Sequence, residues 1–294
     1  MHARQGDLVT DRTVLITGTS SGIGLATAVG AARAGWKVVA TMRDPRKADA
    51  LLKAASEAGV ADRVRVERLD VTDAESVTAC LAEAVAEHGR LDAVVNNAGA
   101  GHLGTVEQDD MAAIRRAMEV NYFGVVEVTR AALPHLRASR GRLVTVTSVG
   151  GVIGQPFNEA YCAAKFAVEG FMESLAPVAA TVGVDVSVVE PGAVASEFVA
   201  ALGVDIPALV AAAGPYAPAL RAYIARTQQS FGNAQTPAEA AAAVIDALTA
   251  ERPAFRVQTS DWARDFTATK LADRDGSAVQ SLMATWVEAE ELGG

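Results

Sequence analysis

Tyr161 and Lys165 are the two side chains whose types and spacing could perform acid–base chemistry in this sequence. Residues four positions apart in a helix lie on one face, one turn from each other, so the ammonium would stand beside the phenol. A free phenol has a pKa of about 10, and a neighbouring positive charge lowers that pKa by stabilising phenolate. Such a tyrosine can give a proton to a carbonyl oxygen or take one from a hydroxyl group.

Ser148 follows residues 142–147, an apolar run that predicts a buried strand. Its hydroxyl would therefore stand at the carboxyl end of a strand, where open α/β sheets bind ligands. A tyrosine and a lysine with this spacing also occur on ordinary helix surfaces. The pair becomes informative only together with motifs elsewhere in the chain.

A glycine-rich turn follows the first predicted strand, residues 13–17, and precedes a predicted helix at residues 25–34. Strand, glycine turn and helix are the context of a dinucleotide-binding loop, because glycines let the backbone approach a pyrophosphate and the helix amino end stabilises its charge. A tight strand-to-helix connection is the alternative explanation. The predicted cofactor loop contains Gly18, Ser20, Ser21, Gly22, Ile23 and Gly24.

Arg43 follows the second predicted strand, residues 37–42, about twenty residues past the glycine loop. An acidic residue at this position would bind the ribose 2′-hydroxyl of NAD. A guanidinium pairs instead with a 2′-phosphate, so the sequence favours NADP(H) over NAD(H). The alternatives are that Arg43 is a solvated surface residue or that Asp44 pairs with it.

Amide side chains mark two further positions. Asn96 and Asn97 directly follow a strand predicted at residues 91–95, and we expect a structural role for Asn96 and a ligand contact for Asn97. A helix predicted over residues 107–138 is expected to be interrupted around residues 121–124, and Asn121 in this apolar stretch is costly unless its amide is satisfied. Asn121 would either hold a water molecule that connects the lysine to solvent or repair a kink.

Residues 193–232 carry apolar side chains among prolines, glycines and alanines, and we predict one or two short helices that form a substrate lid. Any single apolar residue here could equally be ordinary core packing. Pro191 and Gly192 precede the lid and could line the nicotinamide face. The predicted substrate-contacting residues of the lid are Phe198, Tyr216 and Tyr223.

Strands alternate with helices from residue 13 to about residue 257, which predicts one doubly wound parallel sheet of about seven strands with helices on both faces. We expect a single Rossmann-type domain over residues 1–294. The tail at residues 259–294 is predicted to be helical and to cover the pocket or serve an oligomer contact.

Composition excludes several classes of function. The net charge of −9, with no run of basic residues, argues against nucleic acid as a partner. The two cysteines and four dispersed histidines form no disulfide framework or metal-spacing motif. Neither an apolar run of membrane-spanning length nor a signal peptide is present, so a cytoplasmic location is expected.

The motifs taken together resemble those of the short-chain dehydrogenase/reductase family across about residues 13–257. The resemblance implies that Tyr161 is the catalytic acid or base and that Lys165 holds the nicotinamide ribose and lowers the pKa of the tyrosine. Ser148 would bind the substrate carbonyl, and Asn121 would support a water relay. The motifs are Thr17-Gly18-x-x-x-Gly22-Ile23-Gly24, Asn96-Asn97-Ala98-Gly99, Asn121, Ser148 with Tyr161-x-x-x-Lys165, and Pro191-Gly192.

The same resemblance assigns the remaining cofactor contacts. The three loop glycines would receive the pyrophosphate, Asp70 the adenine, Asn97 a ribose and Ser196 the carboxamide. The other residues implied in cofactor binding are Val71, Ala98, Gly99, Pro191, Gly192 and Val194.

A closer likeness, in residues 40–44 and 148–170, is to the branch that contains estradiol 17β-dehydrogenase and a photoreceptor-type retinol dehydrogenase. It implies interconversion of a hydrophobic secondary alcohol and ketone, or of an alcohol and aldehyde, and Arg43 makes NADP(H) the expected cofactor. Because the resembling enzymes pair through long helices, we expect a homodimer or homotetramer paired through residues 107–138 and 157–182. Arg226 stands where the steroid enzyme carries a histidine at the far end of its substrate. The alternatives are the same chemistry on a polar polyketide, sugar or acyl substrate, and a sensor that binds dinucleotide without chemistry.

Overall fold

The computed structural model describes residues 12–196, 203, 205–232 and 234–288. Within them, seven strands form one sheet in the order β3-β2-β1-β4-β5-β6-β7, and all neighbouring strands are parallel. The chain runs outward from β1 to β3 and then returns to place β4 beside β1, which creates the switch point where such sheets bind ligands. The strands are β1 Thr13–Thr17, β2 Lys37–Met42, β3 Val64–Arg68, β4 Ala93–Asn96, β5 Arg142–Val146, β6 Asp185–Glu190 and β7 Arg256–Gln258.

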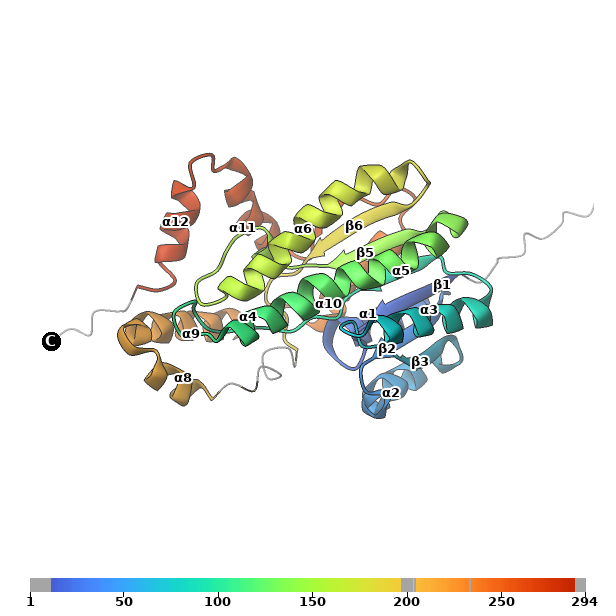
Figure 1. Ribbon diagram of the computed structural model, residues 1–294, viewed down its shortest axis with the longest axis horizontal. Coiled ribbons are helices and arrows are strands. Elements are labelled where there is room, and N and C mark those ends of the chain that lie inside the picture. The colour runs from blue at the N-terminus through green and yellow to red at the C-terminus, as the bar shows by residue number, and fades with distance from the viewer. Residues whose placement is uncertain (1–11, 197–202, 204, 233, 289–294) are drawn as a thin grey trace, which may run out of the picture.

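Helices cover both faces of this sheet, as the doubly wound prediction requires (Figure 1). Helices α1, α2 and α10 pack on one face, and α3, α5 and α6 pack on the other. The helices are α1 Gly22–Arg33, α2 Asp49–Glu57, α3 Ala74–His88, α4 Met111–Met118, α5 Gly124–Ser139, α6 Glu159–Ala180, α8 Ile206–Ala212, α9 Ala217–Gly232, α10 Pro237–Thr249, α11 Asp261–Ala272 and α12 Ser277–Ala284.

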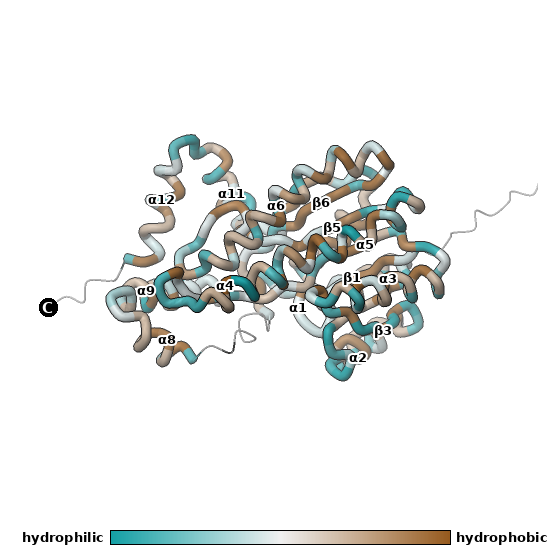
Figure 2. The backbone as a smooth tube through the Cα atoms, viewed as in Figure 1, coloured by the Kyte–Doolittle hydropathy of each residue, from teal (hydrophilic) through white to brown (hydrophobic). Residues whose placement is uncertain are grey.

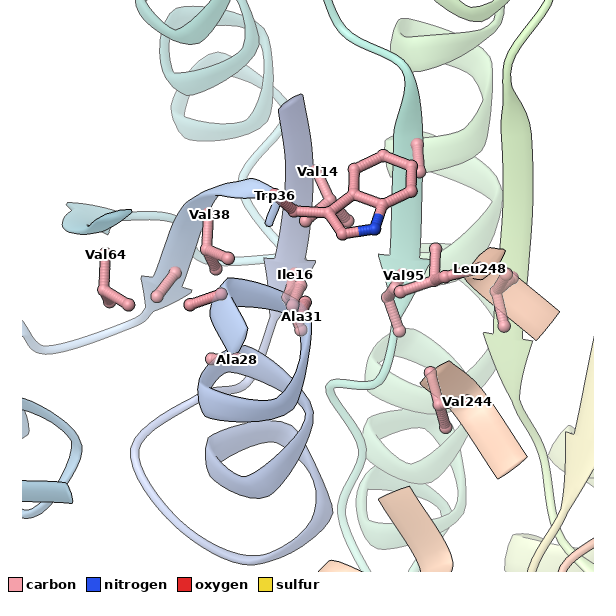
Figure 3. Packing of buried hydrophobic residues seen from close by; sticks show 14 of the residues in the cluster. Val14, Ile16, Ala28, Ala31, Trp36, Val38, Val64, Val95, Val244 and Leu248 are labelled. Atoms are coloured by element: carbon pink, nitrogen blue, oxygen red, sulfur yellow. The ribbon is translucent and has the colours of Figure 1, made fainter. Parts of the chain in front are cut away.

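The two cores follow from the alternation of side chains along each strand. Val14 and Ile16 of β1 pack in the core against α1 and α10, whereas Leu15 between them packs in the opposite core. Figure 3 shows Val14 and Ile16 with Trp36 and Leu248, and Trp36 is almost fully buried. In Figure 2, the tube along β5 and β6 is largely brown, since strands covered on both faces carry mostly apolar residues.

A third apolar cluster joins the lid and tail to the segment that follows β5. It contains Tyr223 of α9, Phe266 of α11 and Trp286 after α12, together with Ile153 and Phe157 from the segment after β5. Helices α8, α9, α11 and α12 gather at one end of the molecule (Figure 1). The lid and tail therefore pack over the segment that follows Ser148.

Helix α4 begins at Met111, later than the predicted residue 107. Asp110 caps it, because its side chain accepts a hydrogen bond from the backbone N–H of Ala113. The predicted interruption near Asn121 is a five-residue π-helix, Glu119–Phe123, between α4 and α5. A π-turn widens the helix locally and often marks a functional position.

Helix α6, which carries Tyr161 and Lys165, spans 22 residues. Its inward face, including Ala164, Val168 and Met172, is fully buried. This packing fixes the position of the two polar side chains relative to β5. None of the helices in the described ranges is long and apolar enough to cross a membrane.

Candidate active site

Ser148 and Tyr161 are in direct contact through their hydroxyl groups, which are hydrogen-bonded to each other. Ser148 comes two residues after the end of β5, and its Oγ also accepts a hydrogen bond of 3.0 Å from the N–H of Gly150. That turn places the serine opposite the first turn of α6. Two hydroxyl groups are thus brought to one point, where both could contact the oxygen of a carbonyl group.

The pKa of Tyr161 is raised to about 12, because burial disfavours the phenolate, although the hydrogen bond with Ser148 acts in the opposite direction. This differs from the expectation that Lys165 lowers it. The lysine Nζ lies 5.9 Å from the centroid of the Tyr161 ring, and it donates a hydrogen bond of 3.2 Å to the carbonyl of Val146. The protein alone therefore holds Tyr161 as a neutral phenol, the form that can donate a proton.

Lys165 is only 4% exposed. Burial lowers its pKa to about 8, and the negative charge of Glu169 opposes that change. A methyl group on Gly99 would lie 3.6 Å from the lysine Nζ and 3.0 Å from Oδ1 of Asn121. The ammonium thus lies between the end of β5 and the loop after β4, close to the π-helix.

Asn121 is fully buried, and its amide is satisfied by backbone groups. Its Nδ2 donates to the carbonyl oxygens of Ala100 and Ala117, and its Oδ1 accepts from the N–H of Ala100. The bond to Ala117 lies within the widened helical turn, which supports the repair of a kink. One lone pair of Oδ1 still remains for a further donor.

The glycine loop fits a dinucleotide. Gly18 has φ +72°, which favours glycine, and a Cβ there would lie 2.8 Å from the Cα of Ala98. A Cβ on Gly24 would lie 2.2 Å from the carbonyl oxygen of Gly18. No side chain caps the N–H groups at the start of α1 through Ser21, and its first turn has no acidic residue. Free N–H groups and close backbone approach are what a pyrophosphate requires.

Asn96, the last residue of β4, and Asn97, which follows it, connect β4 to neighbouring elements. Asn96 donates to the hydroxyl groups of Thr129 and Thr145, at 3.0 and 3.4 Å. Asn97 donates to the carbonyl oxygens of Thr17 and Gly18, at 2.9 and 3.0 Å. The amide nitrogen of Asn97 thus supports the glycine loop, and this structural use was not expected. A contact of Asn97 with ribose stays a prediction.

Arg43 is exposed at the end of β2. The carboxylate of Asp44 does not pair with it, because Arg46 binds both oxygens of Asp44, at 2.9 and 3.0 Å. Asp70, at the end of the neighbouring strand, accepts two hydrogen bonds from Thr72. Arg43 and Asp70 thus place a guanidinium and a carboxylate where the adenosine end of a dinucleotide would lie.

Among the other predicted cofactor residues, Ser196 lies beside the glycine loop, whereas Val194 and Val71 contact other segments. A Cβ on Gly22 would lie 3.4 Å from the Cβ of Ser196, so the segment after β6 closes over the glycines. Val194 forms an isolated bridge with Gln235, and a Cβ on Gly124 would lie 2.7 Å from a methyl of Val71. Ile23, by contrast, packs toward the α1 core.

The lid residues have separate places. Tyr223 is buried between Phe157 and Trp286, with its hydroxyl 2.6 Å from Nδ2 of Asn158. Arg226, one turn later on α9, stacks over the ring of Trp286 at 4.7 Å. Phe198 lies outside the described residues.

Tyr216 is 38% exposed, and its hydroxyl bonds to Glu107 at 2.6 Å. The contact joins the lid to the loop before α4. The roles of Tyr216 and Tyr223 toward substrate stay predictions.

Sequence reasoning missed two features. Phe157, just before α6, has φ +57°, a conformation that costs energy for a residue with a large side chain. It also missed the cluster of Arg256 with Glu169 and Glu190, whose members are far apart in the chain. The buried spacing of Lys165 and Glu169 on one helix face was the signal that could have drawn attention to Glu169.

The fold and the site together define a class: an oxidoreductase that binds a nicotinamide dinucleotide at the switch point of a doubly wound sheet. The family model for short chain dehydrogenase matches residues 12–206. The chain belongs to the short-chain dehydrogenase/reductase family, as the motifs indicated, and acts on alcohol groups or the corresponding carbonyls.

Individual comparisons agree on the branch. The chain is 39% identical to retinol dehydrogenase 8 of Homo sapiens over 280 residues, which cover 90% of this chain and 87% of that protein. It is 39% identical to 17-beta-hydroxysteroid dehydrogenase type 1 of Homo sapiens over 271 residues, 90% of this chain and 82% of that protein. The crystal structure of a short-chain dehydrogenase from Streptomyces avermitilis has a TM-score of 0.73 and 32% identity, and covers 95% of this chain and 97% of that chain.

Proposed function

We propose that this protein is an NADP(H)-dependent oxidoreductase that interconverts a hydrophobic secondary alcohol and ketone, or an alcohol and aldehyde. The observation that carries the proposal is the hydrogen bond between Ser148 and Tyr161 beside the buried ammonium of Lys165. Similarity to retinol and 17-beta-hydroxysteroid dehydrogenases supports a hydrophobic substrate. The apolar cluster of lid and tail, next to Ser148, supports the same class.

In the reductive direction, Tyr161 donates its proton to the carbonyl oxygen of the substrate, and Ser148 stabilises the negative charge that develops there. The bound cofactor supplies the hydride. Lys165 stabilises the phenolate that remains, and its proton is then available for return to Tyr161. Asn121, which lies beside Gly99 and near the lysine, would hold a water molecule in that path.

The preference for NADP(H) rests on Arg43. The carboxylate of Asp44 is bound by Arg46, so the guanidinium of Arg43 remains available to a 2′-phosphate. A guanidinium pairs with a 2′-phosphate and has no acceptor for a 2′-hydroxyl proton. The two cysteines are free thiols, which fits the proposed cytoplasmic location.

We also propose a homo-oligomer that is paired through α4, α5 and α6. Exposed apolar residues support it, since Phe123, Phe166 and Val178 are 50%, 37% and 64% exposed on or beside these helices. Light scattering of the purified protein tests the proposal, and the mass of a single chain would contradict it.

The reaction is tested by following the absorbance of NADPH or NADH with steroid, retinoid and small ketones and aldehydes, and with Tyr161→Phe as the blank. Oxidation of NADPH that depends on Tyr161 is the expected result. Tight NADPH binding without turnover of any compound would instead favour the sensor, or a polar substrate outside this panel.

A further inference from the structure

Glu169 lies one helical turn after Lys165 on α6 and is only 5% exposed. A Cβ on Gly151 would come within 3.1 Å of both the Cγ of Glu169 and the carbonyl oxygen of Lys165. The side chain of Thr147 contributes to lowering the pKa of this carboxyl group. The side chain of Glu169 is therefore packed against the turn that follows Ser148.

Arg256 of β7 forms an ion pair with this carboxylate. Its Nη2 lies 3.2 Å from Oε2 of Glu169 and 2.9 Å from Oε2 of Glu173, and its Nε lies 2.8 Å from Oε1 of Glu190. Glu190, the last residue of β6, is fully buried and also accepts a hydrogen bond from Gln258. One arginine thus faces three carboxyl groups, and ionised Glu169 and Glu173 alone exceed its charge, which leaves negative charge beside α6.

Lys165 is the cation on α6 that interacts with this excess charge. Burial lowers the pKa of Lys165, whereas the charge of Glu169 raises it. Burial likewise raises the pKa of Glu169, whereas Arg256 and Lys165 lower it. The two buried groups on one helix face therefore stabilise each other in their charged forms.

We propose that Glu169 is a positioning residue for the reaction: held by Arg256, it keeps Lys165 protonated where the lysine binds the cofactor ribose and supports Tyr161. This inference rests on the proposed function, since it assigns Lys165 a role toward the cofactor. Glu169 touches neither cofactor nor substrate and acts only through the lysine.

The test is NADPH affinity as a function of pH, measured by fluorescence titration between pH 6 and 9.5. Affinity of the wild type should fall as the pH rises through the Lys165 pKa of about 8. In Glu169→Gln the fall should move down by about one pH unit, which weakens binding about fivefold at pH 8 and little at pH 6. With saturating NADPH, kcat at pH 6 should stay near that of the wild type while KM for NADPH at pH 8 rises.

Glu173→Gln is the matched control, because Glu173 binds the same Arg256 but has a 64% exposed side chain and lies a turn farther from Lys165. It should leave the pH profile unchanged. Glu169→Asp keeps the negative charge and should therefore show most of the wild-type pH dependence of NADPH affinity. Both control variants retain Glu190, the other buried carboxylate that faces Arg256.

If Glu169→Gln does not fold, Glu169→Met takes its place with the same expected shift, since an apolar residue of similar length suits the buried position. Identical profiles for the neutral variants and Glu173→Gln would overturn the proposal. So would failure of both neutral variants to fold beside a stable Glu169→Asp, because the carboxylate would then serve the fold. If the wild type binds no NADPH at any pH, the proposed function itself fails.

Discussion

Trp262 of α11 lies against Gly192: a Cβ on that glycine would come within 2.8 Å of Cζ3 of the indole. The tail therefore reaches the segment after β6 that was predicted to line the nicotinamide face. Trp262 also stacks on Phe266 at 4.9 Å, which connects it to the apolar cluster of lid and tail. Because half of this side chain is exposed, we expect Trp262 to act mainly on the predicted nicotinamide-lining segment and less on the core.

Replacing Trp262 by Ala should weaken NADPH binding about 3- to 10-fold, as expected for the loss of about 0.5–1.5 kcal/mol of aromatic contact. Isothermal titration of NADPH measures the change. Leu271→Ala, at a 69% exposed position of the same helix, is the control and should bind like the wild type. Equal affinities for wild type and Trp262→Ala would show that the tail does not support the cofactor.

Replacing Gly24 by Ala should destabilise the fold and weaken cofactor binding together. The new methyl would meet the carbonyl oxygen of Gly18 at 2.2 Å and Nδ2 of Asn97 at 2.3 Å, and neither group can move without losing its hydrogen bonds. Overpacking of this kind costs about 1–3 kcal/mol. Urea unfolding measures it, with Gly154→Ala as the control, since nothing lies within 4 Å of a Cβ at Gly154.

Replacing Arg43 by Asp should move the cofactor preference from NADPH toward NADH, because the carboxylate repels a 2′-phosphate and accepts a ribose hydroxyl. The ratio of kcat/KM values for the two cofactors measures the preference. Lys47→Ala is the control, since Lys47 is an exposed cation four residues after Arg43 and its removal leaves Asp44 bound by Arg46. An unchanged ratio in Arg43→Asp would remove Arg43 from the cofactor site.

Glu190 should make the protein less stable as the pH rises from about 4.5 to about 7. Burial, aided by the charge of Glu169, raises its pKa from 4.5 to about 7, although Gln258 and Arg256 oppose this. The folded state therefore holds a proton that the unfolded chain releases above pH 4.5, and this stabilisation is lost as the pH passes 7. The loss should be about 1–3 kcal/mol.

Urea unfolding at pH 5 and pH 7.5 measures this dependence. In Glu190→Gln, the free energy of unfolding should decrease less between pH 5 and pH 7.5 than in the wild type. Glu173→Gln, at the exposed side of the same arginine, should show the wild-type decrease. The same slope in wild type and Glu190→Gln would mean that Glu190 stays ionised throughout.

The sequence predicted the doubly wound sheet because strands buried on both faces leave continuous apolar runs, such as residues 13–17 and 142–146. It also predicted that Ser148, Tyr161, Lys165 and Asn121 belong together, and the fold places them around one point. Local spacing was sufficient there, since a single helix turn and a single strand end determine most of the geometry.

Contacts between distant residues could not be predicted in the same way. Arg256 meets Glu169 across 87 positions of sequence, and no local pattern records that pairing. The predicted lowering of the Tyr161 pKa was also wrong. The spacing of residues shows which charge lies near the phenol, but it does not show that burial has the larger effect on the pKa. The structural bonds of Asn97 likewise depend on the path of β1 beside β4.

Transfer of deuterium from NADPH in which both C4 hydrogens are replaced by deuterium, to the carbonyl carbon of a hydrophobic ketone, tests the central claim most directly. Mass spectrometry of the alcohol product should find one deuterium per molecule formed by the wild type, and Tyr161→Phe should form product about 10²–10⁴-fold more slowly while binding NADPH equally well. Undiminished product formation by Tyr161→Phe, or product without deuterium, would contradict the account.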